Sequence, residues 1–119
     1  MSIAVTNGDK YIVVGSYKKI CVWNLQEKRQ EIVLKGHTGT VKSIAVSHDN
    51  KYIISGGDDT VRVWDLQEKN QIAVFRRHVS VTSLAVTSDN CIVSGGSDSI
   101  MVWNFQEKSH HVLHNVRSK

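Results

Sequence analysis

The chain repeats one seven-residue segment three times, and this repetition constrains its fold more than any other feature. The copies are NLQEKRQ at 24–30, DLQEKNQ at 65–71 and NFQEKSH at 104–110. The second copy begins 41 residues after the first, and the third begins 39 residues after the second. The residues upstream of each copy also match, from SIAV or SLAV to the tryptophan before the segment. A period of this size indicates that one supersecondary unit occurs three times.

Each unit contains four short runs rich in valine and isoleucine, with turn-forming residues between them. In the second unit the predicted strands are Val41–Val46, Lys51–Ser55, Thr60–Asp65 and Gln71–Phe75. Apolar and polar residues alternate along the third of these runs, and no stretch shows a helical period. The sequence therefore predicts an all-β fold of three four-stranded antiparallel sheets.

Composition places the chain among ordinary globular proteins. Its 119 residues are 40% apolar and 22% charged, which suits one domain. No apolar run approaches membrane-spanning length, and the start lacks the basic and apolar pattern of a secretory signal. Cys21 and Cys91 occupy unrelated positions of the repeat, so no disulfide framework is expected. We expect an intracellular protein, cytoplasmic or nuclear and not secreted, with no membrane association.

Two short motifs identify the repeat. Gly36-His37 precedes the first predicted strand of the second unit, and Val63-Trp64-Asp65 closes its third strand. In these residues the chain resembles the WD-repeat family, whose members fold as β-propellers with one four-stranded blade per repeat. The resemblance covers essentially the whole chain and implies an open or incomplete ring. The implied blades, parts of one propeller domain, are about 1–35, 36–77 and 78–119.

The resemblance also implies a role for the repeated segment and for four polar positions of each unit. The segment would be the solvated turn between the third and fourth strands. In the second and third units, a histidine, a serine, an aspartate and the tryptophan would form a structural hydrogen-bond network within the blade. The expected members are His37, Ser55, Asp59 and Trp64, and then His78, Ser94, Asp98 and Trp103. Because the third unit ends the array, we expect Trp103 to contribute less to stability than Trp64.

The chain departs from the family pattern in several places. Trp23-Asn24 and Trp103-Asn104 replace the WD dipeptide, and Arg77-His78 replaces Gly-His. The first unit has Val14 and Lys18 in the serine and aspartate positions, so no network is expected there. The turn that holds Asp59 is one residue shorter than usual, so Asp58 could compete with Asp59 for His37.

Serine, histidine and aspartate are also the parts of a hydrolase triad. Two near-copies of the set, with no G-x-S-x-G elbow, favour the structural interpretation, and we expect no enzyme activity. The glycine turns precede no helix that could cradle a phosphate. His110, His111 and His114 lack further ligands nearby in sequence, so neither a metal nor another cofactor is expected.

The family most often docks partners on the propeller face formed by the loops after the second and fourth strands. By resemblance, that face would carry Tyr17, Lys18, Lys19, Lys35, Thr38, Thr40, Arg76, Arg77, Val79 and Ser80. Half of these ten residues are basic, which favours an acidic segment of a partner protein. The predicted function is a non-catalytic scaffold or protein-interaction module.

Two alternatives stay open. The same face could bind nucleic acid weakly, although aromatic residues for base stacking are nearly absent from its loops. The chain could also be a fragment of a larger propeller without independent function. A closed ring typically has 4–8 blades, so three blades imply either a homodimer or missing flanking blades.

Overall fold

The structure is a computed structural model that describes residues 1–57, 60–76, 80–89, 91–97, 99–104, 107 and 109–115; residues 114 and 115 are described by their backbone only. The first sheet contains β1 (Ser2–Val5), β2 (Tyr11–Gly15), β3 (Tyr17–Asn24) and β4 (Arg29–Thr40). The second contains β5 (Ser43–Val46), β6 (Tyr52–Gly56), β7 (Val61–Asp65) and β8 (Asn70–Phe75). The third contains β9 (Val81–Val86), β10 (Cys91–Gly96), β11 (Ser99–Asn104) and β12 (Ser109–Asn115). All neighbouring strands are antiparallel and follow chain order, so the predicted all-β class and three sheets are confirmed.

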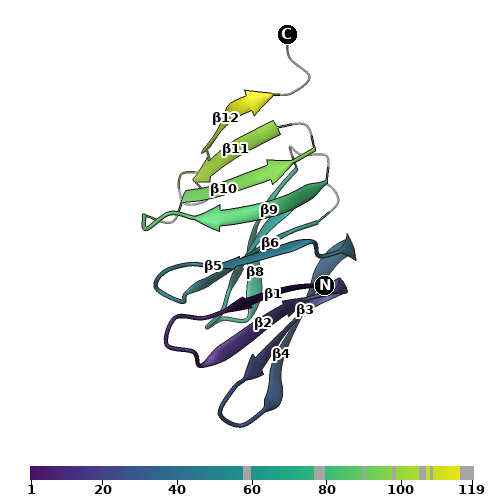
Figure 1. Ribbon diagram of the computed structural model, residues 1–119, viewed down its shortest axis with the longest axis vertical. Coiled ribbons are helices and arrows are strands. Elements are labelled where there is room, and N and C mark those ends of the chain that lie inside the picture. Colours follow the sequence, from purple (N-terminus) through teal and green to yellow (C-terminus); the bar gives the residue numbers. More distant parts are fainter. Residues whose placement is uncertain are drawn as a thin grey trace.

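The three sheets stack in chain order along the long axis of the molecule, with the first sheet at the bottom of Figure 1 and the third at the top. The molecule measures 52 × 28 × 20 Å. The first strands of the sheets, β1, β5 and β9, lie next to one another. Each later sheet is also tied to the one before it by a backbone bond. The Val41 amide donates to the Ser16 carbonyl at 2.9 Å, and the Val81 amide donates to the Gly57 carbonyl at 2.7 Å.

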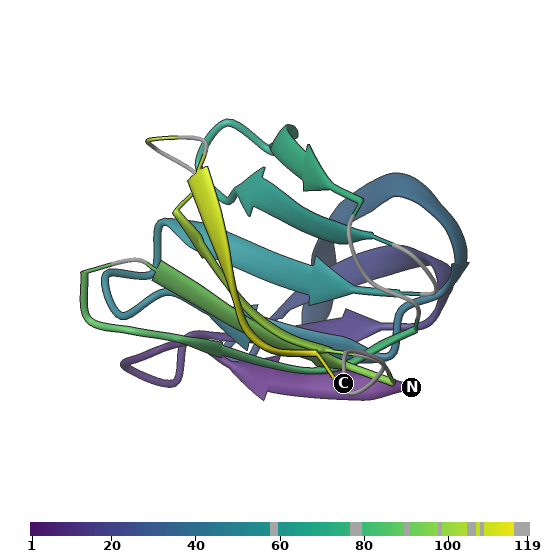
Figure 2. The same ribbon diagram turned by 90° about the horizontal axis from the view of Figure 1, so that it is seen from above.

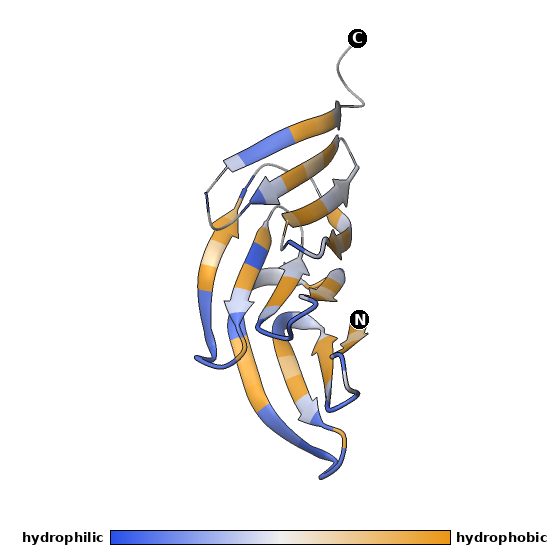
Figure 3. Cartoon of the chain, turned by 90° about the vertical axis from the view of Figure 1, so that its left-hand side faces the viewer, coloured by the Kyte–Doolittle hydropathy of each residue, from blue (hydrophilic) through white to orange (hydrophobic). Residues whose placement is uncertain are grey.

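A separate hydrophobic core fills each joint between sheets. The first core consists of Val13, Ile20, Val22, Leu34, Val41, Ile53 and Trp64. The second consists of Ile54, Val61, Val63, Val81, Ile92, Met101 and Trp103. Adjacent residues such as Ile53 and Ile54 point to opposite faces of a strand, so the middle sheet is buried on both sides. Hydrophobic residues accordingly follow the strands in Figure 3, while hydrophilic residues gather at the turns.

The repeated segment forms the turn between the third and fourth strands of the first two sheets, and its described residues in the third unit make the same bond. The last residue of the third strand accepts, through its side-chain oxygen, a hydrogen bond from the backbone N–H three residues later. The pairs are Asn24 with Glu27 at 3.0 Å, Asp65 with Glu68 at 2.8 Å, and Asn104 with Glu107 at 3.0 Å. Lys28 and Lys69 then take a left-handed conformation, with φ of 53° and 60°. Asparagine can replace the aspartate of the WD dipeptide because both supply this oxygen.

Asp65→Ala should lower the free energy of unfolding by about 0.5–1.5 kcal/mol, because the Glu68 amide loses its side-chain acceptor. Asp65→Asn should stay close to the parent chain, since asparagine keeps an acceptor oxygen as Asn24 and Asn104 do. Urea unfolding of the two variants makes the comparison. Equal losses for alanine and asparagine would show that the aspartate contributes something other than this bond.

The described residues include no helix of the length and hydropathy needed to cross a membrane.

Candidate functional site

The turns gather at the two ends of the strands. Figure 2 shows the β1–β2 turn at one end and the β4–β5 connection at the other. Because every sheet is an antiparallel meander, the links after its second and fourth strands share one end. The predicted docking residues belong to this end. We call its described members the basic face: Tyr17, Lys18, Lys19, Lys35, Thr38, Thr40, Arg76 and Ser80. The predicted residues Arg77 and Val79 lie outside the part of the chain that the structure describes.

Pairing of β3 with β4 brings six of these residues together on the first sheet. Tyr17 lies opposite Thr40, and Lys19 lies opposite Lys35. The register shifts between Tyr17 and Lys19, and Lys18 takes a φ of 66° there, so it stands in a bulge. Tyr17 and the three lysines are exposed. Like charges directly opposite each other on a sheet are destabilising, and an anionic ligand would offset that cost.

The remaining two members lie farther along the array, at the joint between the second and third sheets. Arg76 follows β8 and is exposed, and Ser80 precedes β9. The Lys42 ammonium donates to the Ser80 hydroxyl at 2.7 Å, which adds a cation that sequence reasoning missed. Lys42 was placed inside a predicted strand, whereas β5 begins one residue later. In the sequence, Lys42 differs from the third unit only in that Thr82 stands at the equivalent position, and this difference does not reveal the contact with Ser80.

The described carboxylates lie away from the basic face. They occur in or beside the turns at the opposite end of the sheets: Asp9, Glu27, Glu31, Asp49, Asp65, Glu68, Asp89 and Glu107. One of them shows a shifted titration: the Thr87 hydroxyl donates to Asp89 and holds the pKa of that carboxyl below its usual value. Asp58, Asp59 and Asp98 lie outside the described residues. The described charges at the basic end are therefore all cations, whereas the opposite end combines these carboxylates with Lys10, Lys28, Arg29, Lys51 and Lys69.

A buried hydrogen-bond chain supports the segment of β4 that carries Lys35 and Thr38. His37 Nε2 lies 2.6 Å from Ser55 Oγ, and the Trp64 indole N–H donates to the same oxygen at 2.8 Å. All three residues are buried. Because His37 belongs to β4 and the other two belong to the second sheet, the chain links the first sheet to the second. It holds the end of β4 in place beneath the exposed basic face.

The third unit contains part of the equivalent arrangement. The Trp103 indole donates to Ser94 Oγ at 2.6 Å, and both residues are buried. Asp59, His78 and Asp98, which the family resemblance assigns to the networks, lie outside the described residues. In the first sheet Val14 occupies the serine position, and Lys18 is exposed in its bulge. Within the described part of the chain, no group of three or more histidine, cysteine, aspartate or glutamate residues could hold a metal ion.

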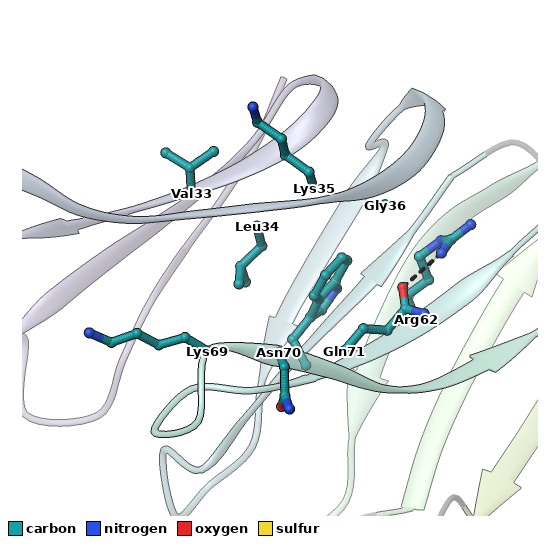
Figure 4. Close-up of a pocket in the computed structure, with 9 residues that line it drawn as sticks. Val33, Leu34, Lys35, Gly36, Arg62, Lys69, Asn70 and Gln71 are labelled. Carbon is teal, nitrogen blue, oxygen red and sulfur yellow. Dashed lines mark hydrogen bonds between the residues drawn. The ribbon is translucent and has the colours of Figure 1, made fainter.

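A cleft of about 340 Å³ runs between β4 and β8, next to Trp64. Figure 4 shows Leu34 pointing into the cleft, whereas Val33 and Lys35 point away from it on the other side of β4. Arg62 of β7, which is buried, donates to the side-chain oxygen of Gln71 on the neighbouring β8 at 2.7 Å, on one side of the cleft. The alternation of apolar and polar residues along the third run gave no indication that the Arg62 side chain would be buried. The cleft is a seam between the first two sheets, and Arg62, Trp64 and Gln71 in its lining already have hydrogen-bond partners.

A comparison with protein families identifies the class. The family model for the WD domain, G-beta repeat, matches residues 28–65 and 69–104. This chain belongs to the WD-repeat family, as its sequence resemblance predicted, and its three sheets are blades of a partial propeller. The matched residues exclude most of the first sheet, which lacks the serine of the network.

Solved structures show the same fold. A chain described as the structure of U3-55K has a TM-score of 0.89 and 24% sequence identity. The match covers 95% of this chain and 36% of that one. The crystal structure of RRP9 WD40 repeats matches with the same score, identity and coverage. The chain therefore spans about a third of the length of these structures. A comparison with curated proteins finds no match.

Proposed function

We propose that this chain is a non-catalytic interaction module that binds an acidic segment of a partner protein through its basic face. The observation that carries the proposal is the Lys19–Lys35 pair, two exposed cations held directly opposite each other on β3 and β4. Lys18 stands beside them in the bulge, and the Tyr17 ring adds an apolar contact surface. An extended acidic peptide offers closely spaced carboxylates that suit such a row of cations.

Burial of the triad-like residues supports a non-catalytic role. Ser55 is fully buried, and its oxygen is already bonded to the His37 ring and the Trp64 indole. A nucleophile must reach its substrate, and this hydroxyl has no access to one. Members of the WD-repeat family generally act as scaffolds rather than enzymes.

The proposal predicts charge-dependent binding that is specific to one end of the molecule. A labelled peptide of about ten glutamates should bind, and salt should weaken the binding. Lys19→Ala combined with Lys35→Ala should weaken binding by about tenfold, because two of the clustered cations are lost. Fluorescence anisotropy measures both dissociation constants.

A double variant with the same charge change at the opposite end is the control. Lys10→Ala combined with Lys51→Ala removes two cations next to the turns between the first and second strands. It should leave peptide binding within about twofold of the parent chain. Equal losses of binding affinity for both double variants would show that binding depends only on the net charge of the chain, which would contradict the proposal. A single-stranded RNA of the same charge is tested in the same way. If it binds more tightly than the peptide and also depends on Lys19 and Lys35, the face binds nucleic acid instead.

A further inference from the structure

Each end of the stack carries a sheet face that no other sheet covers in the part of the chain that the structure describes. We call the side of a sheet toward its predecessor the leading face, and the opposite side the trailing face. The leading face of the first sheet exposes Ile3, Val5 and Trp23, and the trailing face of the third exposes Ile100. Apolar patches of this kind on a folded protein mark an interaction surface.

The open leading face is a near copy of one that is already buried. Five of its residues have an identical residue 41 positions later, on the leading face of the second sheet. The pairs are Ile3 with Ile44, Val5 with Val46, Ile12 with Ile53, Trp23 with Trp64 and Leu25 with Leu66. The second members all pack against the first sheet, in or beside the first core. Trp23 is 40% exposed, whereas Trp64 is 2% and Trp103 1% exposed.

The open face also has a hollow beside Trp23, at the place where the first sheet covers the equivalent Trp64. A cavity of about 500 Å³ is lined there mainly by Ile3, Ile12, Val14, Trp23 and Leu25. At the corresponding place on the second sheet, the trailing face of the first sheet fills the space. Val13, Ile20 and Val22 of the first sheet lie in the core that the two sheets share. The internal joint thus shows what kind of surface the hollow accepts: the trailing face of a sheet of this repeat.

The third sheet presents such a trailing face. Val93, Ile100 and Val102 occupy the positions of Val13, Ile20 and Val22 in the first sheet, as the strand registers show. The first-sheet residues are fully buried, whereas Val93 and Val102 are only half-buried and Ile100 is exposed.

A glycine on each trailing face shows how closely the next sheet approaches. A Cβ built on Gly15 would lie 2.6 Å from a methyl carbon of Val41, and one on Gly56 would lie 2.4 Å from a methyl carbon of Val81. At the equivalent Gly95, the only described atom within 4 Å is the Ser83 hydroxyl of the same sheet, at 2.7 Å. The third sheet therefore has the glycine that the other two use for close packing, with no described strand of another sheet against it.

We infer that the apolar hollow of the open leading face, around Ile3, Trp23 and Leu25, packs against the trailing face of the third sheet of a second copy of this chain. One chain carries both halves of the joint, so two copies form two identical joints. Such a head-to-tail contact closes into a ring when each copy turns through half a circle. The product is a six-sheet propeller, within the usual range of 4–8 blades.

The molar mass of the 119-residue chain tests the inference. Sedimentation equilibrium should give twice the chain mass of 13.3 kDa. Ile100→Asp should weaken the dimer about 100-fold or more, because the joint would bury an unpaired carboxylate. Ile72→Asp is the matched control: Ile72 is 45% exposed and Ile100 41%, but Ile72 lies on the middle sheet. Its dimer should persist, and circular dichroism checks that both variants fold.

Mixing two damaged chains tests the head-to-tail arrangement. Trp23→Asp damages only the leading face, and Ile100→Asp damages only the trailing face. Each variant alone should be monomeric, and an equimolar mixture should recover dimer through its one intact joint. A folded monomer of the parent chain would overturn the inference and assign the open faces to blades from another chain. An open series of oligomers, or a dimer insensitive to Ile100→Asp, would overturn the closed two-copy ring.

Discussion

Trp64→Ala and Trp103→Ala should each lower the free energy of unfolding by about 3–5 kcal/mol, the range for truncating a fully buried large aromatic residue. Each indole lies in a core between two sheets and donates a hydrogen bond to a buried serine oxygen. Trp103 also stacks on Phe75 of the preceding sheet, with ring centroids 4.6 Å apart. Each truncation would leave a cavity at a joint and a serine without its indole partner. Urea unfolding measures the two costs.

Tyr17→Ala is the control, because it truncates an exposed aromatic residue outside both cores. It should change stability by no more than about 0.5 kcal/mol. The sequence alone suggested that Trp103 would cost less than Trp64, because the third unit ends the array. The structure gives a reason to expect similar costs instead: the tryptophan of a sheet faces the preceding sheet, so the third unit keeps its partner. A clearly smaller cost at Trp103 would show that the joint between the second and third sheets is looser than the first.

Ser55→Ala should lower the free energy of unfolding by about 1–3 kcal/mol, because the buried His37 ring and Trp64 indole would lose their shared oxygen. Ser88→Ala, in an exposed turn of the third unit, is the matched control and should cost no more than about 0.5 kcal/mol. Thermal or urea unfolding of both variants measures the difference. An equal, small effect at both serines would mean that the network contributes little to stability.

The same variant tests whether Ser55 has a catalytic role. A chromogenic ester incubated with the parent chain should show no turnover above buffer, because the hydroxyl is buried away from any substrate. Turnover by the parent chain that disappears in Ser55→Ala but persists in Ser88→Ala would contradict the non-catalytic function proposed for this chain.

Much of the fold could be predicted from local signals in the sequence. The repeat supplied the number of sheets, and turn residues separated the strands of each unit. Predicted and observed strands of the second unit agree to within two residues, as for Val41–Val46 and β5. The largest difference is at the start of β5, and it reflects tertiary structure. The Val41 amide donates to the Ser16 carbonyl of the first sheet, so Val41 does not join the hydrogen-bond ladder of its own sheet.

Less of the candidate site could be predicted. The family resemblance placed the basic residues at one end of the molecule, but only pairing of β3 with β4 put Lys19 opposite Lys35. Lys42 and Arg62 were missed because local alternation says nothing of a neighbouring sheet. The Lys42 ammonium reaches a serine 38 residues away, and the Arg62 side chain is buried beside the first sheet.

The sequence by itself determined the repeated unit, its four strands and its turn chemistry, because these depend on residues close together in the chain. The Asn24, Asp65 and Asn104 turns show this plainly, since each bond spans three residues. Only the tertiary structure decided which side of each sheet is covered. Trp23 and Trp64 occupy the same position of the same repeat, yet one is exposed and the other buried. Burial depends on whether another sheet packs against that face, and no pattern within a single unit contains that information.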